Sequence, residues 1–188
     1  MIVQQTVPVQ TESEHRTRAV FLALMWALSY PGRPQPLPEP RESGHGGLID
    51  VAAALLDSEV TYYAEDEALA AQMARTGSRR RPAHAADYLF FENSVSTDLS
   101  VLRIGDLEYP DAGATLVLRC DDDEPAENLR LSGPGVQDAL ELRMIGVAAN
   151  FWTARECLIR FPLGIDVFLI RRGQVIGLPR TTKVDICM

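Results

Sequence analysis

The stretch F-P-L-G-I-D-V-F-L-I-R-R-G-Q-V-I-G-L-P-R-T-T-K-V, residues 161–184, decides the expected fold because it is the most strand-like part of the chain. Residues 165–170 are apolar apart from Asp166, and they are rich in β-branched and aromatic side chains. An unbroken apolar run of this length is typical of a strand that is covered on both faces. We therefore expect an interior strand of a layered sheet here.

A hairpin is expected directly after this strand. Arg172-Gly173 predicts a tight turn, because glycine supplies the positive φ that two-residue hairpins need. The second strand covers 174–178 and ends at Pro179, which has no backbone N–H for a ladder. The polar residues 180–183, R-T-T-K, then stand at a strand end, and open α/β sheets usually place their sites at such ends.

Asp166 interrupts the apolar strand and has two interpretations. It either pairs with a buried partner such as Arg180 or stands at the mouth of the strand, where it would face a ligand. A buried ion pair would explain both residues without any ligand.

Two other places are candidate ligand contacts. Gly133 and Gly135 follow a short strand in L-R-L-S-G-P-G-V, and glycine backbone can approach a ligand closely. The alternative is a tight turn, and the G-K-(S/T) ending of a phosphate-binding P-loop is missing. Asp57 follows an apolar pair, where a turn or a cap is the alternative to a ligand contact.

Length and charge limit the possible classes of protein. The 188 residues suit a single domain, 1–188. The net charge of −8 argues against a nucleic-acid-binding protein, because phosphate contacts need a basic face. A few local arginines could still hold a small anion.

The cysteines and histidines predict no bound metal. Cys120, Cys157 and Cys187 are far apart and odd in number, which indicates free thiols in a reducing cytosol. The three histidines have no spacing typical of metal ligands.

The sequence predicts a soluble, cytoplasmic protein without a membrane contact. Its N-terminus has neither the basic nor the apolar region of a signal peptide. The longest apolar run, 19–28, is about half of the roughly 20 residues that a membrane-spanning helix requires.

Helices and strands are expected to alternate along the chain. Residues 1–12 are expected to form an extended arm and 33–47 a loop. The expected helices cover 14–28, 48–56, 66–75 and a segment that begins at the N-cap Asn150 and ends before Pro162. Further strands are expected over 60–63, 86–91, 114–118 and 129–132. This order predicts an α/β domain with three layers, α/β/α, around a mixed sheet with an antiparallel edge.

Four patches of the sequence resemble one known family. They are S-Y-P-G at 29–32, P-D-A-G-A-T-L-V-L at 110–118, L-R-L-S-G-P-G-V at 129–136, and P-L-G-I-D followed by P-R-T-T within 162–182. Together they are similar to the H subunit of the carbon–phosphorus lyase core complex, the PhnH family. Leu22 departs from the pattern, because the family often has arginine there.

The resemblance implies a fold and a setting. Members look like a shortened version of the fold of pyridoxal-phosphate-dependent transferases and usually form homodimers. The implied partners are the G, I and J subunits of the complex. The implied role is to support formation of ribose 1-methylphosphonate 5-triphosphate from ATP and methylphosphonate in phosphonate catabolism.

The residues themselves predict no independent catalytic centre. Lys183 is the sole lysine and stands almost at the C-terminus, so we expect no pyridoxal phosphate and no other cofactor. A structural or ligand-organising subunit, not catalytic by itself, is therefore expected. The candidate ligand-binding residues are Asp57, Gly133, Gly135, Asp166, Arg180, Thr181 and Thr182.

Two alternatives remain open. One is a stand-alone enzyme acting on a small phosphorylated metabolite, which Arg180, Thr181 and Thr182 would grip. The other is a homodimeric binding module with its pocket between the subunits.

Overall fold

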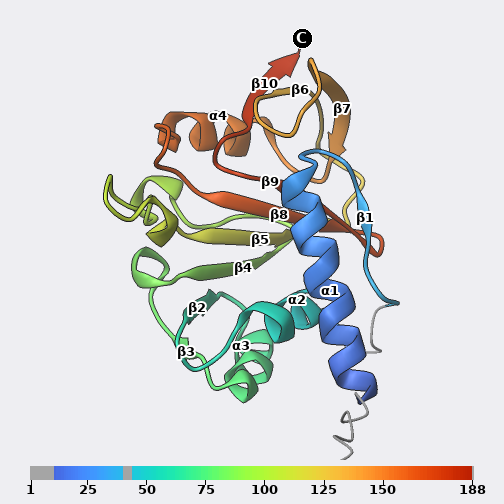
Figure 1. The fold of residues 1–188 in the computed structure, drawn as a ribbon, viewed down its shortest axis with the longest axis vertical. Helices are drawn as coiled ribbons and strands as arrows, with labels where there is room; N and C mark the ends of the chain where they lie inside the picture. Colours follow the sequence, from blue (N-terminus) through green and yellow to red (C-terminus); the bar gives the residue numbers. More distant parts are fainter. Residues whose placement is uncertain (1–10, 40–43, 188) are drawn as a thin grey trace, which may run out of the picture.

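A computed structural model describes residues 11–39 and 44–187 of the chain (Figure 1). The expected N-terminal arm lies outside this description as far as residue 10, and so do positions 40–43 of the expected loop. The α-helices are α1 (Glu12–Ser29), α2 (Gly47–Leu55), α3 (Glu67–Met73) and α4 (Ala149–Leu158). The strands are β1 (Gln35–Pro36), β2 (Thr61–Ala64), β3 (Arg79–Arg80), β4 (Tyr88–Glu92), β5 (Thr115–Arg119), β6 (Ala126–Ser132), β7 (Leu140–Ile145), β8 (Asp166–Arg171), β9 (Gln174–Leu178) and β10 (Lys183–Cys187).

The main sheet is mixed, as expected, and has the order β1-β9-β8-β5-β4-β2-β3. Five strands of this sheet, β8, β5, β4, β2 and β3, run parallel to one another. The strands β9 and β1 are antiparallel to their neighbours and form one edge. The hairpin between β8 and β9 turns at Arg172 and Gly173, which both have positive φ. The stretch 161–184 therefore does supply an interior strand and the start of the antiparallel edge.

Alternating side chains of the central strands enter two separate cores. Phe90, Val117 and Phe168 face a cluster that contains residues of α1, α2 and α3. Leu116 and Leu169 belong to the cluster on the other face. Apolar residues on both faces are what a strand needs when it is covered twice.

The second outer layer differs from the expected one. The sequence predicts helices on both faces, but α4 shares its face with a three-stranded antiparallel sheet, β10-β6-β7, seen beside α4 in Figure 1. The strand expected over 129–132 belongs to this smaller sheet. Residues 140–145, L-E-L-R-M-I, form β7, and their alternation suits an antiparallel strand with one solvated face.

The helix boundaries follow local signals in two cases and miss them in one. Thr11 caps α1 in a capping box with Glu14, and Gly77 adopts the left-handed conformation at the end of the 3₁₀ turn after α3. The expected N-cap Asn150 is wrong, because Ala148 occupies that position and α4 begins at Ala149. A polar side chain near the start of a helix does not by itself determine which residue is the N-cap.

Candidate functional site

The polar run after β9 lies at the amino edge of the parallel strands. Because β9 is antiparallel to β8, Leu178 pairs with Val167, beside the first residue of β8. Open α/β sheets place their sites at the carboxyl edge instead. That general argument therefore does not apply to the run after β9, and a ligand contact there stays a prediction.

Asp166 and Arg180 form the expected ion pair. Arg180 Nη2 lies 2.6 Å from Asp166 Oδ2, and the Arg180 backbone N–H donates to Asp166 Oδ1 over 2.7 Å. Arg180 also donates from Nη1 to the carbonyl of Pro110. The two side chains are only 14% and 18% exposed. The pair therefore joins β8, the loop after β9 and the loop before β5.

Arg155 of α4 fixes the same loop from the other side. Its side chain is fully buried, and it donates to the carbonyls of Thr182 and Pro179 over 3.0 Å each. Burial lowers the pKa of Arg155, and the carboxylate of Glu156 at 2.8 Å partly opposes that effect. The sequence signal for this residue is one arginine within an otherwise apolar stripe, a pattern that does not by itself specify a role.

The two candidate glycines lie against backbone of the other motifs. A Cβ on Gly133 would stand 2.6 Å from the carbonyl oxygen of Thr181. A Cβ on Gly135 would stand 2.8 Å from Pro31 Cδ and from the carbonyl oxygen of Ser29. The patch S-G-P-G therefore packs closely against S-Y-P-G through Gly135 and against P-R-T-T through Gly133, where no side chain would fit.

Thr182 is buried, and its Oγ1 has no hydrogen-bond partner in the part of the chain described. Such a hydroxyl is uncommon, because burying an unpaired polar group is unfavourable. Thr181 is half-buried beside it.

Asp57 lies on the same edge but makes a turn. Its Oδ1 accepts hydrogen bonds from the backbone N–H groups of Glu59, at 2.8 Å, and Val60, at 3.3 Å. Burial raises the pKa of Tyr88, and the carboxylates of Asp87, Asp57 and Asp166 raise it further. Both Asp57 and Asp166 therefore influence Tyr88 electrostatically.

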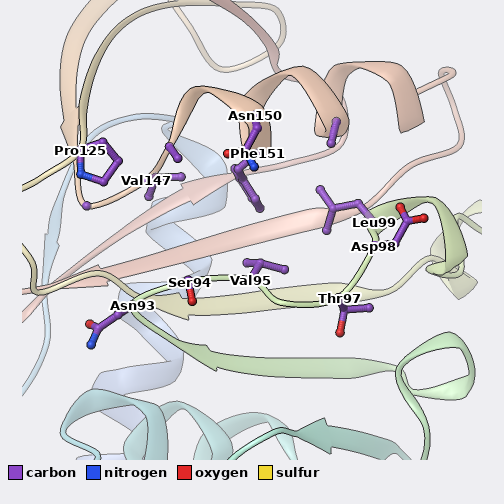
Figure 2. Close-up of a pocket in the computed structure, with 13 residues that line it drawn as sticks. Asn93, Ser94, Val95, Thr97, Asp98, Leu99, Pro125, Val147, Asn150 and Phe151 are labelled. Carbon is purple, nitrogen blue, oxygen red and sulfur yellow. The ribbon is translucent and has the colours of Figure 1, made fainter.

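A cavity of about 360 Å³ lies at the opposite edge of the sheet, next to the carboxyl end of β4 (Figure 2). One wall is the segment 93–99 that follows β4, and the other is the start of α4 with the loop before it. The size is within the range of small-molecule sites. In Figure 2 Val95 and Phe151 lie between these two walls, whereas Ser94 and Thr97 direct their hydroxyls away from α4.

The walls of this cavity suit binding better than acid–base chemistry. Among the described residues, Asp98 is the one ionisable residue that lines it. The backbone N–H of Ser100, which donates to the Asp98 carboxylate over 2.9 Å, lowers the pKa of Asp98. Ala148 caps α4 without a side-chain hydrogen bond. The cavity therefore offers apolar walls and a polar rim, and its described lining holds no nucleophile and base in contact.

Charged side chains gather near a second cavity of about 230 Å³, also at the carboxyl edge. Arg119, at the end of β5, lies 3.1 Å from the Glu92 carboxylate and donates to the Gly44 carbonyl over 2.8 Å. His45 Nδ1 lies 3.1 Å from the same Glu92 carboxylate, and Asp121 lies 3.4 Å from Arg119 Nε. Ionisable groups of both signs therefore lie together here. No local sequence pattern indicates this cluster, because its members come from the ends of β4 and β5 and from two separate loops.

Two kinds of feature are absent from the described ranges, 11–39 and 44–187. No helix there is long and apolar enough to cross a membrane. No group of three or more His, Cys, Asp or Glu side chains there is arranged to hold a metal ion.

Comparisons with known proteins agree with the motif patches. The family described as "Bacterial phosphonate metabolism protein (PhnH)" matches residues 9–185. A protein of Stutzerimonas stutzeri named "Putative C-P lyase subunit protein HtxG" is 35% identical over 173 residues, which cover 91% of this chain and 87% of that one. The "Alpha-D-ribose 1-methylphosphonate 5-triphosphate synthase subunit PhnH" of Rhizobium meliloti is 33% identical over 102 residues, about half of each chain.

Proposed function

Because this chain belongs to the PhnH family of bacterial phosphonate metabolism proteins, we propose that it is a non-catalytic subunit of a carbon–phosphorus lyase complex. In that role it supports the formation of ribose 1-methylphosphonate 5-triphosphate from ATP and methylphosphonate. The proposed partners are the G, I and J subunits, together with a second copy of this chain. We also propose that the fold is a shortened relative of the pyridoxal-phosphate-dependent transferases.

The observation that carries this proposal is that the motif residues bind other groups of the same chain inside the fold. Arg180 and Asp166 bind each other, and Arg155 binds the loop that joins β9 and β10. Gly133 lies against Thr181 of the same loop. Most of the hydrogen-bonding capacity of these groups is therefore used inside the fold and not toward solvent. The motifs therefore build a scaffold that holds surface loops in place.

The loops held in this way carry exposed apolar side chains. Arg180 contacts Pro110, and the Gly164 N–H donates to the Ile104 carbonyl over 3.0 Å, which joins the two loops. Leu107 and Phe161, one on each loop, are 81% and 77% exposed. Exposed apolar side chains on loops that are held in place are a common feature of protein interfaces.

The residues do not fit pyridoxal phosphate. An internal aldimine needs a lysine in a pocket, but Lys183 is 64% exposed and pairs with Asp185 on β10, at 2.8 Å. We therefore propose that a fold of this type is used here without that cofactor.

Co-expression with candidate G, I and J subunits, followed by purification through a tag on this chain and native mass spectrometry, tests the proposal. We expect stoichiometric recovery of the partners. The variant Phe161→Ser should reduce recovery, whereas Arg172→Ala, on the opposite edge of the sheet, should not. Recovery of this chain alone would contradict the proposed role.

Ligand contact by the candidate residues is a second proposal, and the unpaired hydroxyl of Thr182 favours it. Thr182→Val keeps the shape and removes the hydroxyl. Without a ligand the change should be nearly neutral, because no hydrogen bond is lost. If thermal shifts caused by phosphate or methylphosphonate are equal in the variant and the wild-type protein, the hydroxyl has no part in binding.

A further inference from the structure

A third cavity, of about 210 Å³, lies between the small sheet and the hairpin of the main sheet. One wall is β7, which is an edge strand of the small sheet, and the other is formed by β8 and β9 near their turn. Its volume is below the roughly 300–1,000 Å³ that is usual for drug-sized ligands. The cavity therefore suits a small ion or a small metabolite.

Three arginines line this cavity, namely Arg143, Arg171 and Arg172, whereas no described Asp or Glu lines it. Such a group is unusual in a chain with a net charge of −8. The planar guanidinium group of arginine donates parallel hydrogen bonds to the oxygens of carboxylates and phosphates. The lining therefore favours an oxyanion.

Two of these arginines have donors that the described part of the chain does not use. Arg171 Nε is buried and has no hydrogen-bond partner there. Arg143 is exposed, and its side chain makes no hydrogen bond or ion pair with another described residue. A buried donor without an acceptor is unfavourable, so an oxygen atom of a ligand in the cavity would be stabilising.

A carboxylate of the chain itself already binds two of the arginines. Asp123 Oδ1 lies 2.6 Å from Arg171 Nη2 and 2.6 Å from Arg172 Nη2. Asp123 is 75% exposed and does not line the cavity, so it binds the two guanidinium groups from outside. Asp121 also accepts a hydrogen bond from the backbone N–H of Arg172, at 3.2 Å. The two arginines can therefore share one oxyanion, and the nearby acidic side chains compete with an added one.

The buried side of the cavity is apolar and uncharged. Met144 and Leu169 belong to the core, and Ile176 packs against it. Burial raises the pKa of the Cys120 thiol to about 11, although the charge of Arg171 opposes the shift, so the thiol is neutral at neutral pH. An apolar floor below a cationic rim matches a ligand that has an apolar group on one side and an oxyanion on the other.

We propose that this cavity binds a small, doubly charged oxyanion that carries an apolar group, a chemistry that alkyl phosphonates and phosphate monoesters share. Arg143 and Arg171 bind the oxygens, with Arg172 at the rim, and Leu169 and Ile176 contact the apolar group. The proposal goes beyond the assembly role and does not rest on it. It also differs from the contact proposed at Thr182, which lies at the other edge of the sheet.

Calorimetric titration of the full chain at mildly alkaline pH tests the class of ligand. We expect methylphosphonate to bind about fourfold more tightly than inorganic phosphate, as one buried methyl group predicts. Methanesulfonate has a similar shape but a single charge, so it should bind more weakly than methylphosphonate. Methyl phosphate, compared with methylphosphonate, shows which of the two classes fits better. No binding of either, or tighter binding of inorganic phosphate, would overturn the proposal.

Two variants with opposite expected effects test the site itself. Arg143→Ala should weaken methylphosphonate binding at least about fivefold and leave the melting temperature unchanged, because no contact within the described chain is lost. Asp123→Asn should strengthen binding, because it removes a competing carboxylate. The matched control is Arg79→Ala, which removes an exposed arginine from β3, at the other end of the strand order. Equal weakening by Arg143→Ala and Arg79→Ala would indicate general electrostatic attraction and would overturn the site.

Two further measurements separate this proposal from those above. Co-purification of Arg143→Ala should recover the G, I and J subunits as the wild-type chain does. Loss of these partners with unchanged methylphosphonate binding would show that the arginines bind another subunit, and it would overturn the proposal. Binding that is lost in Thr182→Val but kept in Arg143→Ala would place the anion at the amino edge and would overturn it as well.

Discussion

At the amino edge of the main sheet, Arg180 and Arg155 direct their guanidinium groups into the fold, whereas at the carboxyl edge Arg119 and Glu92 lie beside an open cavity. The amino edge holds the motif residues Asp166 and Arg180 and the loop that follows β9. The carboxyl edge holds the cavities described above. A motif can therefore mark the place where backbones must pack closely, while space for a ligand lies elsewhere.

The largest loss of stability is expected when the buried guanidinium of Arg155, at the amino edge, is removed. Arg155→Ala removes the guanidinium donor to two backbone carbonyls and to Glu156, which keeps the backbone N–H of Val184 as a donor, and it opens a cavity. We expect a loss of about 3–5 kcal/mol in the free energy of unfolding, as for other broken buried pairs. The matched change Arg119→Ala at the carboxyl edge should cost about 1–2 kcal/mol, because that site is partly solvated. Urea denaturation of both variants measures the difference, and equal losses would remove the distinction between the edges.

Two glycines with positive φ, Gly133 and Gly173, allow a second comparison of stability between close packing and open space. Gly133→Ala would drive a Cβ against the carbonyl of Thr181, so we expect overpacking to cost about 1–3 kcal/mol in addition to backbone strain. Gly173, in the hairpin turn at the carboxyl edge, has open space around it. Gly173→Ala should therefore cost only the strain, about 1–2 kcal/mol. Thermal unfolding compares them, and a smaller loss for Gly133→Ala would show that the loop can move away.

The ion pair of Asp166 and Arg180 should contribute more to the free energy of unfolding than the surface ion pairs of the β8–β9 hairpin. Arg180→Ala leaves a largely buried carboxylate with one backbone donor, and we expect a loss of about 2–3 kcal/mol. Arg172, whose side chain is 65% exposed, pairs with Asp123 at 2.6 Å. Arg172→Ala should change the free energy of unfolding by less than about 0.5 kcal/mol. An unchanged melting temperature for Arg180→Ala would contradict a structural role for the pair.

A pH-dependent contribution is expected at Asp87, also at the amino edge. Burial by itself would raise the pKa of Asp87, but hydrogen bonds from Thr61 and the guanidinium of Arg103 outweigh it, so the pKa is lowered. Its ionised form therefore favours the folded state. This stabilisation is present above about pH 4, the ordinary pKa, and is lost as the pH falls through the lower folded value.

Asp87→Asn tests this contribution. The stability gap between the wild-type protein and the variant should shrink by about 1 kcal/mol between pH 7 and pH 3. Denaturation at several pH values measures the gap. Thr61→Val, which removes one donor to the carboxylate, should reduce the same pH dependence. A gap that stays constant with pH would show that Asp87 does not contribute through its charge.

The elements with regular apolar patterns could be predicted from the sequence. The period of apolar residues in α1 and the unbroken run in β8 depend on local neighbours and on burial, which one stretch of sequence reveals. The same holds for the hairpin at Arg172-Gly173, because a glycine at positive φ is a local requirement. The motif patches predicted the family, which the comparisons confirm.

The sequence by itself thus determined the layered α/β class, the interior strand and the family. Only the tertiary structure decided which edge the motifs occupy, because the direction of β9 depends on its pairing with β8. It also brought Arg155 to the carbonyls of Pro179 and Thr182, and His45 to Glu92. These contacts join residues far apart in the chain, and no local pattern specifies the partner of a buried charge.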